Sequence, residues 1–180
     1  TFNPLEENID IYTNTLLEAS AGTGKTFSIE NIFVRLLLEN NPYLNSPLKI
    51  ENVLVVTFTR AATADLKHRI RKNIERCLHI LKDFLTNPSA VYNGPYKFLN
   101  NFINQGTDCI KSAFNRLEDA LYCFDQSQIL TIHSFCSKML RENVFEGDLS
   151  VDIKAEEQMS ITEMQQIVRN FFRTELVYDN

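Results

Sequence analysis

The chain of 180 residues is long enough for one domain, or for one domain and the beginning of another. Its composition, 44% hydrophobic and 23% charged, is ordinary for a globular chain, and no apolar run reaches the length of a membrane span. The net charge of −5 argues against a protein that coats nucleic acid without specificity. Four widely spaced cysteines without a Cys-x-x-Cys pair indicate reduced, mostly buried thiols in a cytoplasmic protein.

The first third of the sequence predicts strand, loop and helix in that order. Residues 1–14 form an irregular lead-in, and the short apolar run Thr15–Glu18 is typical of a buried strand. Apolar residues then recur at helical spacing from Phe27 to Leu37, which predicts a helix with one apolar face. After a loop with two prolines, the continuous run Val53–Val56 predicts a strand that is buried on both faces.

Helices are predicted for most of the middle of the chain. The first is long and has an apolar face made of Leu66, Ile70, Ile74, Cys77, Leu78 and Leu81. A loop at 86–95 and two further helical segments lead to Asp125, and Ile129–Ile132 predicts a third strand, followed by a helix through Leu140. A capping box at Ser160 predicts a helical tail. Strands separated by helices imply a parallel α/β sheet.

The segment between the first strand and the first helix has the pattern of a phosphate-binding loop, Ala19-Ser20-Ala21-Gly22-Thr23-Gly24-Lys25-Thr26. Ala19 stands where that pattern has its first glycine. Gly22 and Gly24 let phosphate oxygens approach the backbone and allow the positive φ values that such a loop needs. Lys25 supplies a charge for the β- and γ-phosphates, and the Thr26 hydroxyl can bind Mg²⁺. The alternative is a turn that ends in Lys-Thr by chance, but the strand–loop–helix context favours a nucleotide-phosphate site.

Two further stretches narrow the class of nucleotide-binding protein. The second strand leads into Thr57-Phe58-Thr59-Arg60-Ala61-Ala62, and the third contributes to Thr131-Ile132-His133-Ser134-Phe135. Together with the phosphate loop, these stretches resemble motifs I, Ia and Ic of the UvrD/RecB-like superfamily 1 DNA helicases, among them the exonuclease V beta chains. The resemblance begins near Phe2 and runs to at least Glu146.

The resemblance implies a P-loop NTPase fold of the RecA-like type, a parallel sheet flanked by helices. Residues 1–145 would be the N-terminal part of motor domain 1A, and residues 146–180 a helical tail that enters domain 1B. The implied cofactors are ATP and Mg²⁺, with Lys25 and Thr26 as catalytic residues and Thr26 as a metal ligand. The full-length protein would translocate on DNA, unwind it and degrade it as an exonuclease during recombinational repair of double-strand breaks.

The resemblance also implies partners: single-stranded and duplex-end DNA, and two other subunits of an exonuclease V complex, which are RecC- and RecD-like chains. The residues placed on the DNA are Thr57, Phe58, Thr59, Arg60, His133 and Ser134. Hydroxyl and imidazole groups would bond phosphates there. Phe58 would stack near a base or belong to the core, and both interpretations remain open. The alternative for His133 is a structural histidine bonded to a neighbouring carbonyl group.

Some family features are missing from the sequence. No Gln that could recognise adenine occurs between residues 10 and 14, so base specificity is not visible. Asp125 follows apolar residues, but their spacing is helical and they precede the His133 motif, so we reject Asp125 as a metal ligand. Without an acidic metal motif and arginine fingers, the chain alone should not turn ATP over. The alternatives are another superfamily 1 helicase, a self-contained P-loop kinase or GTPase, and a scaffold with a vestigial loop.

Overall fold

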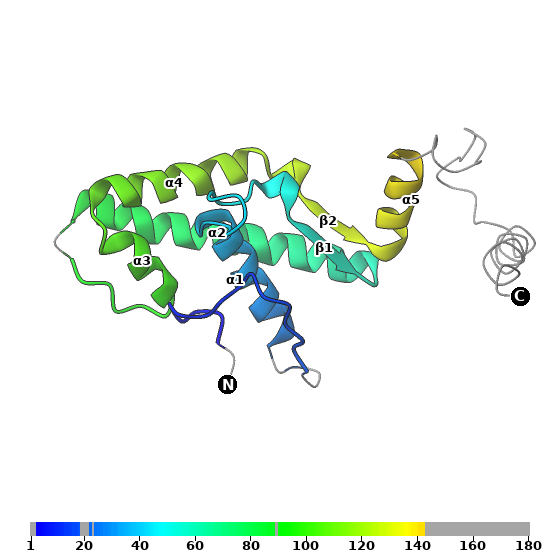
Figure 1. The fold of residues 1–180 in the computed structure, drawn as a ribbon, viewed down its shortest axis with the longest axis horizontal. Coiled ribbons are helices and arrows are strands. Elements are labelled where there is room, and N and C mark those ends of the chain that lie inside the picture. The colour runs from blue at the N-terminus through cyan, green and yellow to red at the C-terminus, as the bar shows by residue number, and fades with distance from the viewer. Residues whose placement is uncertain (1–2, 19–21, 23, 89, 143–180) are drawn as a thin grey trace, which may run out of the picture. The chain divides into compact units, whose positions relative to one another are not determined.

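The computed structural model describes residues 3–18, 22, 24–88 and 90–142. The chain divides into two compact units, residues 1–133 and 134–180. The longer elements are α1 (Lys25–Leu38), β1 (Leu54–Thr57), α2 (Arg60–Thr86), α3 (Asn100–Ile103), α4 (Thr107–Tyr122), β2 (Gln128–Thr131) and α5 (Ile132–Glu142) (Figure 1). Three short 3₁₀ helices are η1 (Ile50–Asn52), η2 (Lys97–Leu99) and η3 (Phe124–Gln126).

The two strands β1 and β2 form a parallel pair. Their register runs from Leu54 opposite Gln128 to Thr57 opposite Thr131, so both strands end at the same edge. Parallel neighbours cannot be joined by a tight hairpin, and here α2, α3 and α4 supply the long crossover connection. The predicted parallel α/β arrangement is therefore present in the described residues, as a two-stranded sheet.

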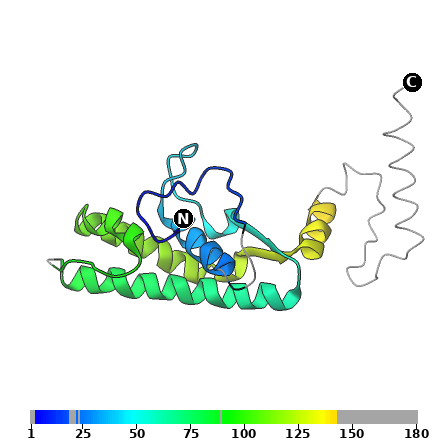
Figure 2. The same cartoon turned by 90° about the horizontal axis from the view of Figure 1, so that it is seen from below.

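Three helices make the core of the first unit. α2 and α4 lie side by side, and α1 packs against both of them (Figures 1 and 2). The helical faces predicted for α2 and α4 are confirmed, since their members are buried or half-buried in one cluster. The face predicted for α1 is confirmed from Phe33 onwards, whereas Phe27 and Ile29 in its first turns are 40% and 38% exposed. That cluster includes Phe33, Val34 and Leu37 from α1, Leu66, Ile70, Ile74, Cys77 and Leu81 from α2, and Ile110, Ala113 and Leu117 from α4.

The prediction that the Val53–Val56 strand is buried on both faces is wrong for the described residues. Leu54 and Val56 are 48% and 41% exposed, whereas Ile129 on the opposite face of the sheet is fully buried. Side chains alternate between the two faces of a strand. α2 contacts both strands and covers one face, and the other face remains open to solvent in the described part of the chain.

The predicted strand Thr15–Glu18 is also absent from the structure, which has no regular element there. Leu16 is 83% exposed, so this segment finds no apolar surface among the described residues. A strand requires a hydrogen-bonded neighbour, and β1 is paired only with β2 in the described sheet. The other strand prediction is confirmed with a shift of one residue, since Ile132 already belongs to α5. The tail helix expected from Ser160 lies outside the described residues.

The expectation of mostly buried thiols is wrong as well. Cys77 is buried, Cys109 and Cys123 are half-buried, and Cys136 is exposed. Burial raises the pKa of the Cys77 thiol to about 12, so this group is neutral at physiological pH.

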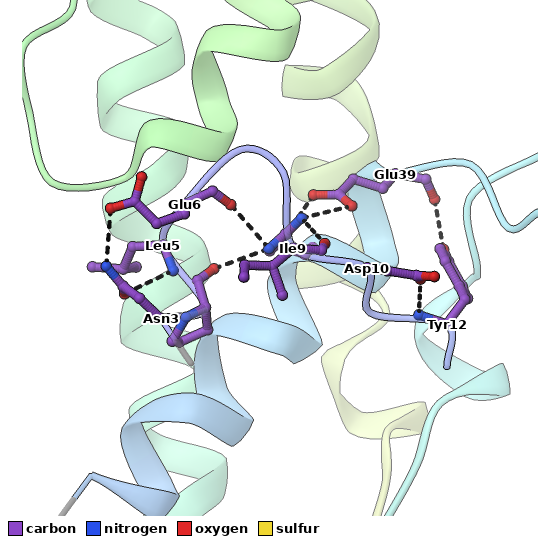
Figure 3. A network of polar contacts seen from close by, with 9 residues as sticks. Asn3, Leu5, Glu6, Ile9, Asp10, Tyr12 and Glu39 are labelled. Carbon is purple, nitrogen blue, oxygen red and sulfur yellow. Dashed lines mark hydrogen bonds and ion pairs between the residues drawn. The ribbon is translucent and has the colours of Figure 1, made fainter. Parts of the chain in front are cut away.

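A buried arginine, Arg35, connects the lead-in segment to the end of α1. Figure 3 shows the polar network between these two parts of the chain, in which Glu6, Ile9 and Glu39 are labelled. The Arg35 side chain is 1% exposed and forms an ion pair with Glu39, in which Nε lies 2.5 Å from Oε1. Its guanidinium group also donates to the carbonyl oxygens of Pro4, Glu6 and Ile9 at 2.8–3.2 Å.

The lead-in makes further contacts on either side of this arginine. The Tyr12 hydroxyl donates to the Glu39 carbonyl oxygen at 2.8 Å (Figure 3). Beyond α1, the Phe98 backbone amide donates to the Leu5 carbonyl oxygen at 3.1 Å, and the Phe98 ring lies 5.7 Å from the Arg35 guanidinium carbon. The Arg35 guanidinium group makes five hydrogen bonds, which compensate the burial of its charge and connect Pro4, Glu6 and Ile9 to α1.

Arg35→Met should therefore unfold the first unit at lower denaturant concentration. The substitution leaves the Glu39 carboxylate without its partner. Removing one partner of a buried ion pair typically lowers the unfolding free energy by about 3–5 kcal/mol. Urea denaturation of the purified protein, followed by circular dichroism, measures the change.

Arg69→Met is the matched control, because Arg69 also pairs with an acid four residues away. That pair, with Asp65, is about half exposed on both sides. Because solvent screens exposed ion pairs, its loss should leave the midpoint of urea denaturation close to that of the parent protein. Equal effects of the two substitutions would contradict the structural role of Arg35.

Candidate nucleotide and DNA site

The end of the predicted phosphate loop has the backbone that such a loop requires. Gly22 and Gly24 have φ values of 81° and 95°, in the left-handed region. A Cβ atom at either position would meet no heavy atom within 4 Å, so the backbone conformation, and not lack of space, favours glycine. The first part of the loop, Ala19–Ala21 and Thr23, lies outside the described residues.

Gly24 is the N-cap of α1, and Lys25 and Thr26 open its first turn. Both side chains are exposed, and no acidic residue lies in that turn. Unpaired backbone N–H groups and the helix dipole favour an anion at such a terminus. The arrangement can hold a phosphate group with a lysine and a hydroxyl beside it, as the sequence predicts.

The second and third motifs meet at the carboxyl edge of the sheet. Thr57 ends β1 opposite Thr131, which ends β2. β1 is followed by Phe58, Thr59 and then α2, while β2 passes directly into α5. Two helices thus begin beside the ends of two parallel strands, although the two motifs are more than 70 residues apart in the sequence.

Most of the residues predicted to contact DNA are exposed at this edge. Phe58 is 78% exposed, and Thr59, Arg60 and His133 are exposed as well. Phe58 is therefore not a core residue in the described part of the chain, which leaves its ring accessible to a base. Ser134 belongs to the second unit and is exposed there.

Thr57, Thr59 and Thr63, at the end of β1 and the start of α2, are connected by hydrogen bonds. The Thr59 hydroxyl accepts from the Ala62 backbone amide at 3.1 Å and so caps α2. The hydroxyls of Thr57 and Thr63 lie 2.5 Å apart, and Thr63 donates to the Thr59 carbonyl oxygen at 3.0 Å. Thr59 still has an O–H hydrogen that can be donated to a phosphate.

The structural roles of Thr59 and Thr63 were missed by sequence reasoning. A threonine directly before a helical pattern is a signal for an N-cap, so the role of Thr59 was detectable. The role of Thr63 was not, because it depends on the path of β1 into α2.

Three arginine side chains of α2 make contacts with other residues of this protein. Arg69 pairs with Asp65 at 2.7 Å, Arg76 donates to the Tyr96 hydroxyl at 2.6 Å, and Arg71 lies 5.2 Å from the centre of the Phe124 ring. These three contacts leave fewer of the basic side chains of α2 available to a ligand. Arg60 is the first residue of α2 and lies at the sheet edge. It is the basic residue that the sequence analysis predicts to contact DNA.

Asp125 lies in η3, before β2 begins. It is therefore at the amino end of that strand, opposite to the edge where the predicted motifs meet. No group of three or more His, Cys, Asp or Glu residues that could hold a metal ion occurs among the residues described by the structure. None of the described helices is long and apolar enough to cross a membrane.

Thr59→Ala should lower the unfolding free energy by about 1 kcal/mol, because α2 loses its N-cap. Thr59→Ser keeps the capping oxygen and should stay close to the parent protein. Thermal unfolding of both variants measures the difference. Equal midpoints for the alanine and serine variants would show that the cap does not stabilise the fold.

Comparison with known proteins gives a family. Residues 6–178 match the UvrD/REP helicase N-terminal domain. The chain is 36% identical over 168 residues to the RecBCD enzyme subunit RecB of Escherichia coli, covering 92% of this chain and 13% of that protein.

Two further relatives give similar values. The RecB subunit of Chlamydia pneumoniae is 37% identical over 78% of this chain, and that of Mycobacterium tuberculosis is 33% identical over 91%. The alignments cover 12% and 14% of those two proteins, so the chain spans a small part of the length of these relatives. With a family match over nearly all of its residues, the chain belongs to the UvrD/REP helicase family, as a RecB-like member that matches its N-terminal domain.

Proposed function

We propose that this chain is the ATP-binding part of a DNA helicase that acts in recombinational repair of double-strand breaks. The observation that carries the proposal is the left-handed Gly24 directly before Lys25 and Thr26, at the exposed start of α1, in a member of this family. That geometry supports a nucleotide bound by its phosphates.

In the proposed site, Ala19–Thr26 surrounds the phosphates of ATP. Lys25 neutralises the β- and γ-phosphate oxygens, and Thr26 binds the Mg²⁺ that accompanies the nucleotide. When bound, Mg²⁺ would offset the charge that develops during phosphoryl transfer. The exposed positions of Lys25 and Thr26 agree with these roles.

Single-stranded DNA is the proposed ligand of the sheet edge. Phe58 offers a ring for stacking on a base, while Thr59 and Arg60 offer donors to phosphates. Thr57, His133 and Ser134 complete the proposed set, with Thr57 half-buried and bonded to Thr63. Contacts to phosphates and to the faces of bases do not depend on the base sequence of the DNA. Such contacts suit a protein that moves along DNA.

The complete protein is proposed to use ATP for translocation and duplex unwinding, and to carry an exonuclease activity. The relatives are named as subunits of a RecBCD enzyme, so we propose RecC- and RecD-like companions and duplex-end DNA as a substrate. This chain alone should not turn ATP over. An arginine finger is commonly worth a factor of about 10³–10⁵ in rate, and none of the arginines in the described residues is assigned that role here.

Lys25→Ala should weaken the binding of Mg·ATP by about one to two orders of magnitude, since a charge-assisted contact contributes roughly 1.5–3 kcal/mol. Isothermal titration calorimetry measures the affinity. Lys111→Ala, an exposed lysine on α4, is the matched control and should bind as the parent does. An unchanged affinity in Lys25→Ala would remove the nucleotide assignment.

Phe58→Ala combined with His133→Ala should weaken the binding of a labelled oligothymidylate. Losing the stacking of one base should weaken the binding free energy by about 1–3 kcal/mol. The remaining affinity should fall with added salt, because phosphate contacts release counterions. Fluorescence anisotropy at two salt concentrations tests both points.

Tyr122→Ala is the matched control for this measurement. Tyr122 is an aromatic residue that is 91% exposed, and it lies at the end of α4, not at the carboxyl edge of the sheet. Binding that survives the Phe58 and His133 changes, or that falls equally in Tyr122→Ala, would exclude this edge as the DNA surface.

A further inference from the structure

Two buried amides connect α1 with α2 inside an otherwise apolar interface. Asn31 and Asn73 are 0% and 2% exposed. Asn73 Nδ2 donates to Asn31 Oδ1 at 3.0 Å and to the Glu30 carbonyl oxygen at 3.2 Å. Asn31 Nδ2 in turn donates to the Phe27 carbonyl oxygen at 2.7 Å.

This amide pair is not required for packing. The same two helices contribute Val34, Ile70 and Ile74 to the buried apolar cluster, and a pair of leucines has a size similar to that of the two asparagines. Burying an amide is unfavourable unless every polar atom finds a partner. Here Asn73 Oδ1 is buried without a hydrogen-bond partner among the described residues, so the pair is an imperfect solution as far as stability is concerned.

The hydrogen bonds between the amides are directional, so they can fix the register of the two helices. Apolar side chains allow two packed helices to slide or rotate slightly, whereas hydrogen bonds between amides are lost when the register changes. A fixed register is the best-attested use of a buried polar pair.

The position of the pair connects the two proposed ligand sites. The chain of hydrogen bonds ends at Phe27, two residues after Lys25, in the first turn of the phosphate-loop helix. α2 is a continuous helix of 27 residues that begins at the Thr59 cap, beside the end of β1. A rotation of α1 against α2 would therefore change where Lys25 and Thr26 lie relative to the sheet edge.

We propose that Asn31 and Asn73 are positioning residues that lock the register of α1 against α2 and thereby couple nucleotide binding to DNA binding. This inference depends on the proposed function, since it assigns a role between the two sites of that function. Neither amide touches nucleotide or DNA in the proposed arrangement.

The test uses the complete protein with its companion subunits and the double variant Asn31→Leu/Asn73→Leu. Replacing both partners removes the hydrogen bond without leaving a new orphan, so thermal stability should be unchanged or higher. The stimulation of ATP hydrolysis by single-stranded DNA should fall by about 2- to 30-fold, the range seen when coupling between sites is altered. KM for ATP without DNA should stay as in the parent.

A folded double variant with the parent's stimulation would overturn the inference. Ile70→Leu/Ile74→Leu is the matched control, since it alters apolar packing on the same helix, and an equal loss there would also overturn it. If the double variant does not fold, Asn31→Leu alone decides by the same criterion, because Asn73 then keeps its bond to Glu30. A parent protein without DNA-stimulated hydrolysis would instead refute the proposed function, and the coupling with it.

Discussion

Parallel pairing of β1 with β2 is the constraint on which the rest of the structure depends. Parallel strands need a long crossover, and the crossover here consists of α2, α3 and α4. α2 and α4 then form, with α1, the apolar core that makes the pair stable. The same pairing brings Thr57 and Thr131 together, so that segments distant in the sequence share one edge.

Polar groups buried in the first unit have two different roles. Arg35 is fully satisfied by one carboxylate and three carbonyl oxygens, and its role is to hold the lead-in against the end of α1. In the pair of Asn31 and Asn73, Asn73 Oδ1 has no hydrogen-bond partner among the described residues. A satisfied buried charge agrees with a contact that stabilises the fold, whereas an amide pair with an orphaned acceptor agrees better with a contact that sets the register of two helices.

The open face of the sheet explains the main error of the sequence analysis. The run Val53–Val56 is apolar at every position, and such a run predicts a second layer over the strand. Among the described residues only one face is covered, so Leu54 and Val56 are exposed. A hydrophobic pattern indicates that a side chain is suited to burial. It does not indicate which part of a chain packs over that side chain.

The sequence by itself determined the main helices and the family. Helical spacing of apolar residues predicted α1, α2 and α4, because the periodicity of a helix is a property of neighbouring residues. Gly22, Gly24, Lys25 and Thr26 predicted a phosphate loop, and the glycine φ values agree with it. The resemblance to helicase motifs likewise needed only residues close together in the chain.

Only the tertiary structure decided which residues meet across long separations. It joined Arg35 to Pro4 and Ile9, Asn73 to Asn31, and the end of β1 to the end of β2. It also showed Phe58 exposed and the Thr15–Glu18 segment without strand structure. The physical reason is the same in each case: burial, hydrogen bonding and strand pairing depend on partners tens of residues away, and local pattern carries no information about which partner is reached.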